Sequence, residues 1–256
     1  MAAREPYSLA IVVEVFGSSS AKAGAKALFD ARGRMLSGWI GGGCAQTMTA
    51  RAGLECLQQR EPRMIEIDLN DEVFGAGMPC GGHMRVYVEP VLPPPRLWLL
   101  GFGGIAEALN RFAQMSGFEV VVNDPQATDA CFPGVSHLIS DDPRYQKLEP
   151  ASCDFVIVAT HHKGDYDAII RSLASPVDYI ALVASRTRAQ LVLQRLANEG
   201  VDPGQLQRVR SPAGLNLGAK TPEEIALAIV SEMVMVRRKG DGVPLSQPVS
   251  PSQQNK

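Results

Sequence analysis

Apolar residues in positions 1–92 fall in several short, strand-like runs, dense in Ile and Val at 8–16 and alternating with polar residues at 64–69. Strands are predicted at 8–16, 25–30, 35–40, 64–69 and 85–89. Ala50, Leu54 and Leu57 interrupt this pattern with helical spacing and predict one helix that begins near residue 41. Residues 1–92 are therefore expected to form a small α+β domain.

A different pattern follows Pro93-Pro94-Pro95, a stiff and extended segment that we interpret as a linker. Unbroken apolar runs at 155–159 and 179–183 are typical of strands buried on both faces of a parallel sheet. Helices are predicted at 166–173 and 187–198 and from a capping box at Thr221-Pro222-Glu223-Glu224 to Arg237-Arg238-Lys239-Gly240. Residues 96–240 thus predict an α/β domain with a Rossmann-type, doubly wound parallel sheet. The Pro, Ser and Gln content of residues 241–256 predicts a disordered tail.

A glycine turn follows the first predicted strand of this second domain. Gly101, Gly103 and Ala106 have the G-x-G-x-x-G/A spacing of a dinucleotide fingerprint, and Gly104 lies inside it. The small residues let backbone approach a pyrophosphate, which the N-terminus of the next helix attracts. Asp124 ends the second strand about 20 residues later, where a ribose-binding carboxylate is expected. The alternative is a Rossmann scaffold that packs on these glycines and binds no dinucleotide.

Charge and composition exclude several classes of protein. The 256 residues carry a net charge of −2 and no basic stripe, so nothing indicates a nucleic-acid partner. No apolar run approaches the roughly 20 residues of a membrane span, and no signal-peptide pattern opens the chain. We therefore expect a cytoplasmic protein, in which the five cysteines are thiols unless they bind a metal or carry sulfur.

Two cysteines stand next to glycines in the first domain. Gly41-Gly42-Gly43 precedes Cys44, and Cys80 precedes another glycine pair. The glycines permit close approach by a ligand, and a helix N-terminus favours the thiolate form of Cys44. Both thiols are candidate sulfur carriers or metal contacts; the alternative is that each is a small buried hydrophobe. Cys80 and His83 also have the spacing of zinc ligands, but a second pair of ligands is missing from the sequence pattern.

Polar residues follow two predicted strands of the second domain. Thr160 and His161 come after the run at 155–159, and Ser185 and Arg186 follow the next strand. Ligands of open α/β sheets bind beyond the carboxyl ends of the strands, which makes these residues candidate ligand contacts. His161 is also a candidate acid or base that Asp165 would orient. The alternatives are solvated histidines and, for Ser185, a helix cap.

At these positions the chain resembles the XdhC/CoxI family, accessory proteins for molybdenum hydroxylases of the xanthine dehydrogenase and carbon monoxide dehydrogenase types. The resemblance rests on the glycine turn and on segments 24–26, 38–44, 80–82, 124–125, 160–161, 185–186 and 212–226. It implies a maturation factor rather than a catalyst, which binds the molybdenum cofactor (molybdopterin or its cytosine dinucleotide), assists its sulfuration and delivers it to a target molybdenum hydroxylase. A cysteine desulfurase partner and a homodimer are further implications.

Some positions depart from the family pattern. Ser20-Ala21, Ala45-Gln46, Gln126 and Ala184 replace residues that are usual there, and the first and third changes remove positive charge near expected phosphate positions. These departures favour a divergent, CoxF-like branch that would use the cytosine dinucleotide form. The competing hypothesis from a different class is an NAD(P)- or FAD-dependent oxidoreductase that uses Asp124 and His161.

Overall fold

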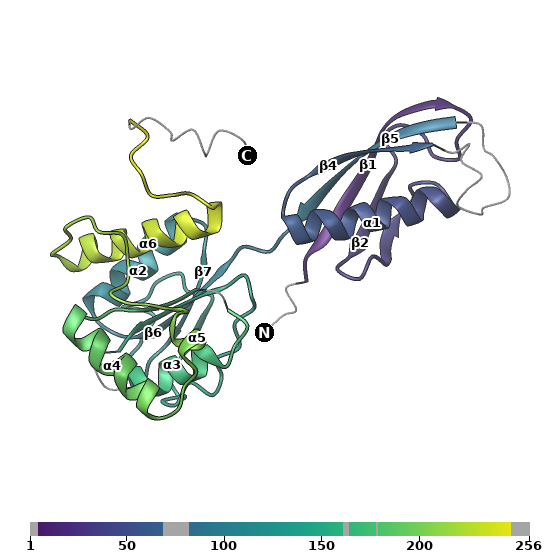
Figure 1. The fold of residues 1–256 in the computed structure, drawn as a ribbon. Coiled ribbons are helices and arrows are strands. Elements are labelled where there is room, and N and C mark those ends of the chain that lie inside the picture. Colours follow the sequence, from purple (N-terminus) through teal and green to yellow (C-terminus); the bar gives the residue numbers. More distant parts are fainter. Residues whose placement is uncertain (1–4, 69–81, 161–163, 178, 247–256) are drawn as a thin grey trace. The chain divides into compact units, whose positions relative to one another are not determined.

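The computed structural model describes residues 5–68, 82–160, 164–177 and 179–246 (Figure 1). The chain divides into two compact units, Met1–Pro93 and Pro94–Lys256. Each unit has its own sheet and its own hydrophobic core. None of the helices in the described ranges is long and apolar enough to cross a membrane.

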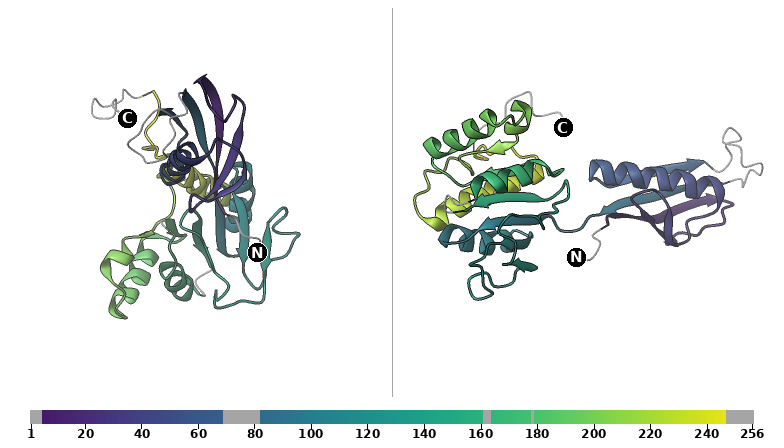
Figure 2. Two further views of the ribbon diagram at one scale, coloured as in Figure 1. Left: turned by 90° about the vertical axis from the view of Figure 1, so that its right-hand side faces the viewer. Right: turned by 90° about the horizontal axis from the view of Figure 1, so that it is seen from below.

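Unit 1 is an antiparallel sheet with one helix. Its elements are β1 (Tyr7–Gly17), β2 (Lys26–Asp30), β3 (Met35–Gly38), α1 (Gly43–Gln59), β4 (Arg63–Asp68) and β5 (Gly82–Val91). The strand order is β3-β2-β1-β5-β4. Helix α1 covers one face of the sheet, as the ribbon diagrams show (Figures 1 and 2). The third strand ends at Gly38 instead of residue 40, because the chain there leaves the sheet and buries Ile40 in the core.

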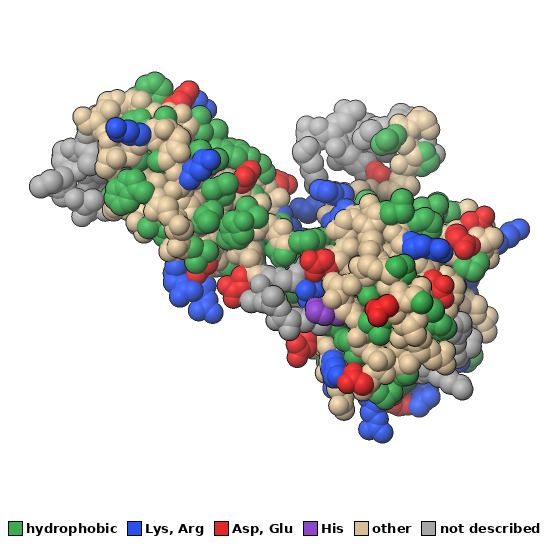
Figure 3. Space-filling model, turned by 180° about the vertical axis from the view of Figure 1, so that it is seen from behind, with side chains coloured by type: hydrophobic (Ala, Val, Ile, Leu, Met, Phe, Trp, Pro, Cys, Tyr) green, Lys and Arg blue, Asp and Glu red, His purple; other side chains and the backbone are tan. Residues whose placement is uncertain are grey.

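Alternation along β1 decides which side chains enter the core of unit 1. Ala10 and Val12 are buried on the side of α1, whereas Leu9 and Ile11 alternate with them and are only partly buried. Figure 3 shows hydrophobic side chains gathered on the sheet face that α1 leaves uncovered. The strands of this unit therefore have one fully buried face and one partly exposed face, on which hydrophobic side chains lie beside charged pairs such as Arg85 and Glu14.

Unit 2 contains a six-stranded parallel sheet. Its elements are β6 (Arg96–Gly101), α2 (Gly104–Met115), β7 (Glu119–Asn123), β8 (His137–Ile139), β9 (Phe155–Ala159), α3 (Asp165–Leu173), β10 (Tyr179–Leu182), α4 (Arg186–Asn198), α5 (Pro203–Leu206), β11 (Val209–Arg210) and α6 (Pro222–Arg238). The strand order β11-β10-β9-β6-β7-β8 is that of the Rossmann fold, with its switch point between β6 and β9. The predicted fold class is confirmed.

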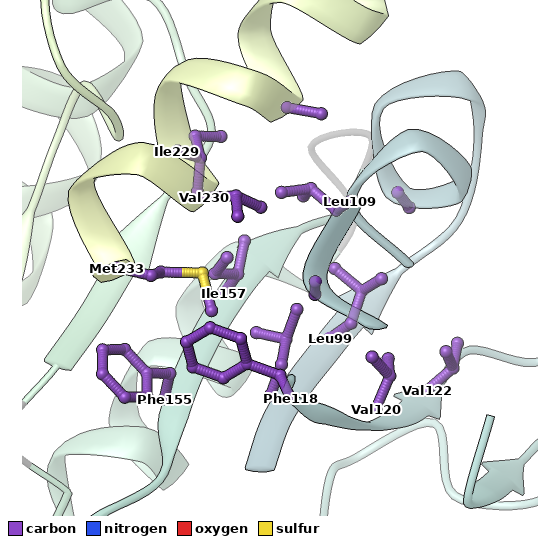
Figure 4. Packing of buried hydrophobic residues seen from close by; sticks show 14 of the residues in the cluster. Leu99, Leu109, Phe118, Val120, Val122, Phe155, Ile157, Ile229, Val230 and Met233 are labelled. Carbon is purple, nitrogen blue, oxygen red and sulfur yellow. The ribbon is translucent and has the colours of Figure 1, made fainter. Parts of the chain in front are cut away.

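Helices cover both faces of this sheet because successive side chains of β6 point to opposite sides. Leu97 and Leu99 join the core beneath α2 and α6, and Figure 4 shows Leu99 packed with Leu109, Ile229 and other members of that cluster. Trp98 and Leu100 join the opposite core beneath α3 and α4. All four side chains are fully buried, as the unbroken apolar run predicts.

Helix α6 begins at the predicted capping box, in which Thr221 and Glu224 cap each other's backbone N–H groups. At its end, Lys239 rather than Gly240 has the left-handed conformation, with φ 57°. The sequence pattern did not predict β8, α5 and β11, each of which has four residues or fewer. Most of the predicted disordered tail, residues 247–256, lies outside the described residues.

Candidate functional site

A cavity of about 800 Å³ opens at the carboxyl edge of the parallel sheet in unit 2. Residues from four segments line it: 102, 104 and 105 after β6, 159–160 at the end of β9, 183–186 after β10, and 212–219, 222, 225 and 228 from the last loop and the start of α6. This edge lies at the switch point of the strand order, where ligands of open α/β sheets bind. Four predicted contacts, Gly104, Thr160, Ser185 and Arg186, come together in its lining.

The glycine turn forms one wall of the cavity. Gly101 has φ 133°, and a Cβ atom there would clash with the backbone of Ala159 on the neighbouring strand. Gly103, with φ 105°, is the N-cap of α2 and supplies no side chain to cap the helix. The first N–H groups of α2 are therefore left without a capping side chain, as an anion-binding helix N-terminus requires.

The other two helices that begin at the cavity are capped by their own side chains. The Ser185 hydroxyl accepts a hydrogen bond from the backbone N–H of Arg188 at 3.3 Å, and Thr221 caps α6 together with Glu224. Ser185 is thus a helix cap, one of its two predicted roles, and it also lines the cavity. Of the three helix starts, α2 alone has no side-chain cap in the described part of the chain.

The described lining of the cavity carries positive charge and no negative charge. Arg186 is the only charged side chain among the described residues of the lining, and none of these residues is acidic. The rest of the surface is mainly apolar, with Phe102, Ile105, Val183 and Ile225 among its side chains. Such a site suits a ligand with an apolar or aromatic body and an anionic group.

A buried polar cluster lies beside the cavity. The Thr160 hydroxyl donates to one carboxylate oxygen of Asp165, and the Arg188 guanidinium donates to the other oxygen at 3.1 Å. The Asp165 side chain is only 5% exposed, so these partners satisfy a carboxylate that would be costly to bury alone. Asp165 was expected to orient His161; its described partners are Thr160 and Arg188, and His161 lies outside the described residues.

Asp124 follows β7, as the fingerprint predicts, but it is not part of the cavity lining. It is partly buried, and one carboxylate oxygen accepts a hydrogen bond from the backbone N–H of Gln126 at 2.8 Å. The other predicted contacts of the turn, Gly101 and Gly103, flank lining residues. A ribose-binding role for Asp124 stays a prediction.

The loop before α6 is the part of the site that sequence reasoning missed. Residues 212–219 all line the cavity, although the sequence singled them out only as part of segment 212–226, on which the family resemblance rests. The buried Glu232 holds this loop, because its carboxylate accepts from the Gly214 N–H at 2.9 Å and from the Tyr179 hydroxyl at 2.8 Å. Burial, and then the nearby Glu232 charge, raise the pKa of Tyr179 well above its usual range, which keeps this donor protonated. The glycines at 214 and 218 were the available signal.

The second predicted site lies in unit 1. Gly41-Gly42-Gly43 forms the turn into α1, and Cys44 is a partly exposed thiol in its first turn. Cys80 lies outside the described residues, and no group of three or more metal-ligating side chains occurs in the ranges that are described. Cys56 is a core cysteine: its thiol donates to the Val88 carbonyl at 3.4 Å, and burial raises its pKa.

Comparison with known proteins gives a consistent result. The family described as the XdhC Rossmann domain matches residues 97–233, and the XdhC and CoxI family matches residues 1–68. The uncharacterized protein YqeB of Escherichia coli K12 is 30% identical over 254 residues, which are 96% of this chain but 46% of YqeB. The chain therefore spans about half the length of that relative.

Two further proteins align over nearly their whole length. A Bacillus subtilis protein named as a probable xanthine dehydrogenase subunit is 25% identical, over 92% of this chain and 94% of its own. A crystal structure named as a xanthine dehydrogenase from Bacillus halodurans has the same fold, with a TM-score of 0.51 and 24% identity over 95% of this chain and 94% of that one. Because one family model covers more than half of the chain and a second covers much of the rest, this protein belongs to the XdhC and CoxI family.

Proposed function

We propose that this protein is an accessory factor in the maturation of a xanthine dehydrogenase-type molybdenum hydroxylase, and that the cavity of unit 2 holds the phosphate-bearing pterin cofactor as its cargo. Family membership and the Bacillus subtilis relative, whose name refers to xanthine dehydrogenase, support the target class. A carbon monoxide dehydrogenase is the second candidate target, as the resemblance to the CoxF-like branch implies.

The single observation that carries the proposal is that the described lining of the cavity supplies positive charge and no negative charge. An anion entering it meets the uncapped N-terminus of α2 and the Arg186 guanidinium, and no carboxylate of the described lining opposes it. The apolar walls suit a flat heterocycle, and a volume of about 800 Å³ is in the range of small-molecule sites. The donor set therefore fits an aromatic body that ends in a phosphate. It fits both the monophosphate and the dinucleotide form of the cofactor.

Cys44 is the proposed sulfur-handling residue of unit 1. It is a partly exposed thiol at the start of α1, whose N-terminus also has no side-chain cap. A thiolate there is a suitable acceptor of sulfur from a cysteine desulfurase and a soft ligand for molybdenum. Cys80 and His161 keep their predicted roles as further candidates, and a homodimer remains part of the proposal.

The proposal is tested by cofactor binding to the purified full-length protein. The molybdenum cofactor is titrated anaerobically into the native protein, Arg186→Gln and Arg171→Gln, which removes an exposed arginine of α3 outside the cavity. A charge-assisted hydrogen bond is worth about 1.5–3 kcal/mol, so Arg186→Gln should weaken binding roughly 10- to 100-fold. Equal affinities for the two variants would contradict the proposed site.

The cysteine role has its own test. Cys44→Ala should leave cofactor binding by unit 2 intact but reduce activation of the target hydroxylase when the assay starts from unsulfurated cofactor, a cysteine desulfurase and free cysteine. The matched control is Cys153→Ala, which removes another partly exposed thiol. If Cys44→Ala and the native protein activate the target equally well, Cys44 carries no sulfur.

One observation favours a second candidate function, an NAD(P)- or FAD-dependent oxidoreductase. The strand order is that of dinucleotide-binding enzymes, and Asp124 stands at the end of β7, where a ribose contact is expected. Stoichiometric retention of NAD(P) or FAD, with no binding of the pterin, would favour this function. In that case Asp124→Asn should weaken dinucleotide binding.

A further inference from the structure

The cavity loop 211–221 has two fixed ends, and both are held by helix α6. At the first end, the Gly214 N–H donates to Glu232 at 2.9 Å and the Leu215 N–H donates to the Ala228 carbonyl at 3.1 Å. Gly214 also packs so closely against α6 that an added Cβ would lie 3.0 Å from the backbone nitrogen of Ile229. This end is therefore fastened by hydrogen bonds and by close packing.

A second glutamate of α6 fastens the other end of the loop. One carboxylate oxygen of Glu224 accepts from the Lys220 N–H at 2.7 Å and from the Thr221 N–H at 3.0 Å. These hydrogen bonds hold the pKa of Glu224 below its usual range, so the carboxylate stays ionised at neutral pH. Glu224 and Glu232 thus fix the two ends of one loop to the same rigid element.

Residues 216–219 between these ends are held much less. Within the described part of the chain, their only hydrogen bond is from the Leu217 N–H to the Leu215 carbonyl at 2.8 Å, inside the loop itself. Leu217 is 56% exposed although it lines the cavity. Gly218 has φ 73°, and a Cβ added there would meet no atom within 4 Å, so the backbone at this position has room to turn.

We propose that residues 216–219 form a lid that closes over the ligand of this cavity, with Glu224 and Glu232 as the positioning residues of its two ends. In the closed state Leu217 covers the apolar body of the ligand, and the Asn216 amide donates to its anionic group. Closure is favoured because it removes the exposed leucine from water. The inference rests on the proposed anion-binding cavity, but it does not depend on which anion is the natural cargo.

The first experiment needs no ligand. Amide hydrogen exchange of the full-length protein should show that residues 216–219 exchange faster than residues 214–215 and 220–221. Glu232→Leu should raise exchange at 214–215 without changing 220–221, whereas Glu232→Gln, which can still accept hydrogen bonds, should stay near the native pattern. Uniform protection across the loop would overturn the proposal.

The second experiment measures escape from the cavity with 8-anilinonaphthalene-1-sulfonate, a fluorescent anion with an apolar body. Leu217→Ser should speed dissociation of the dye roughly five- to tenfold. The closed state of this variant no longer gains the free energy of burying the leucine, which is 56% exposed when the lid is open. The matched control is Leu227→Ser, which changes a leucine of α6 that is 48% exposed but outside the cavity lining. Arg186→Gln should weaken the same signal and so assign it to the cavity.

The two proposals fail separately. If the dye dissociates faster from Leu217→Ser than from Leu227→Ser while the pterin cofactor does not bind, the lid stands and the proposed function falls. If the cofactor binds but the two leucine variants release both ligands at equal rates, the function stands and the lid falls. If Arg186→Gln leaves the dye fluorescence unchanged, both the proposed lid and the proposed anion-binding role of the cavity are refuted.

Discussion

The hydrogen bonds of the Glu232 carboxylate predict how much three substitutions should destabilise unit 2. The cost should rise from Glu232→Gln through Tyr179→Phe to Glu232→Leu. One oxygen accepts from both the Tyr179 hydroxyl and the Gly214 N–H, at 2.8 and 2.9 Å, and the other accepts from Arg210 at 3.2 Å. Glutamine keeps an oxygen where these two donors meet and loses only the bond to the arginine. Leucine leaves the buried Tyr179 hydroxyl and the partly buried Gly214 N–H without an acceptor.

The expected costs follow from which donors stay buried. The Arg210 side chain is 43% exposed and can turn to water, so Glu232→Gln should cost about 1 kcal/mol or less. Tyr179→Phe removes one hydrogen bond to a charged group and should cost about 2 kcal/mol. Glu232→Leu leaves two unsatisfied donors at about 1–3 kcal/mol each, and should cost about 3–5 kcal/mol in all.

Trp98 is the natural reporter for this measurement because it is fully buried in unit 2. In a Trp39→Phe background, which removes the tryptophan of unit 1, urea unfolding followed by fluorescence reports on unit 2 alone. A cost of 2 kcal/mol corresponds to a loss of about 4–8 °C in Tm for a domain of this size. Equal destabilisation by Glu232→Gln and Glu232→Leu would refute the reasoning, because charge rather than hydrogen-bond acceptance would then dominate.

Three further predictions concern pH, backbone and thiol chemistry. Burial raises the pKa of Asp142, but hydrogen bonds from Lys147, Gln146 and Asn123 outweigh it and hold the pKa below its usual value of about 3.9. The stability from this group is therefore present above about pH 4 and lost as the pH falls below it, and Asp142→Asn should flatten the acid limb of a urea-midpoint profile between pH 2 and 6. Gly101→Ala should destabilise unit 2 by several kcal/mol more than Gly117→Ala, because both have positive φ but only Gly101 faces a neighbouring strand; equal urea midpoints would contradict this. Peptide mass spectrometry after brief native alkylation should find Cys44 modified and Cys56 unmodified, and early modification of Cys56 would contradict its buried position.

Local signals in the sequence were sufficient for most of the fold. The apolar run of β9, the helix cap at Thr221 and the glycine turn at 101–104 depend on residues within a few positions of one another. Backbone dihedrals, caps and side-chain periodicity act over that range, so each element is readable in isolation. β11 spans two residues and β8 three, which is too short for any periodicity, and only pairing with a neighbouring strand makes them strands.

The sequence predicted several individual residues of the candidate site, but it did not predict the cavity that they form together. Gly104, Thr160, Ser185 and Arg186 were each recognised from their place after a strand, and the parallel strand order brings them to one edge. The cavity loop was not recognised, because its role depends on Glu232, which lies 18 positions from Gly214 and 53 from Tyr179.

The sequence by itself thus determined the two kinds of sheet, the helix starts and the residues able to bind an anion, because these depend on short-range geometry and on side-chain chemistry. The tertiary structure alone decided that the starts of α2, α4 and α6 meet at one cavity, that no described carboxylate lines it, and that Glu232 of α6 holds the cavity loop at Gly214. Those properties are relations between distant segments, and only packing of the parallel sheet and its helices brings such segments within hydrogen-bonding distance.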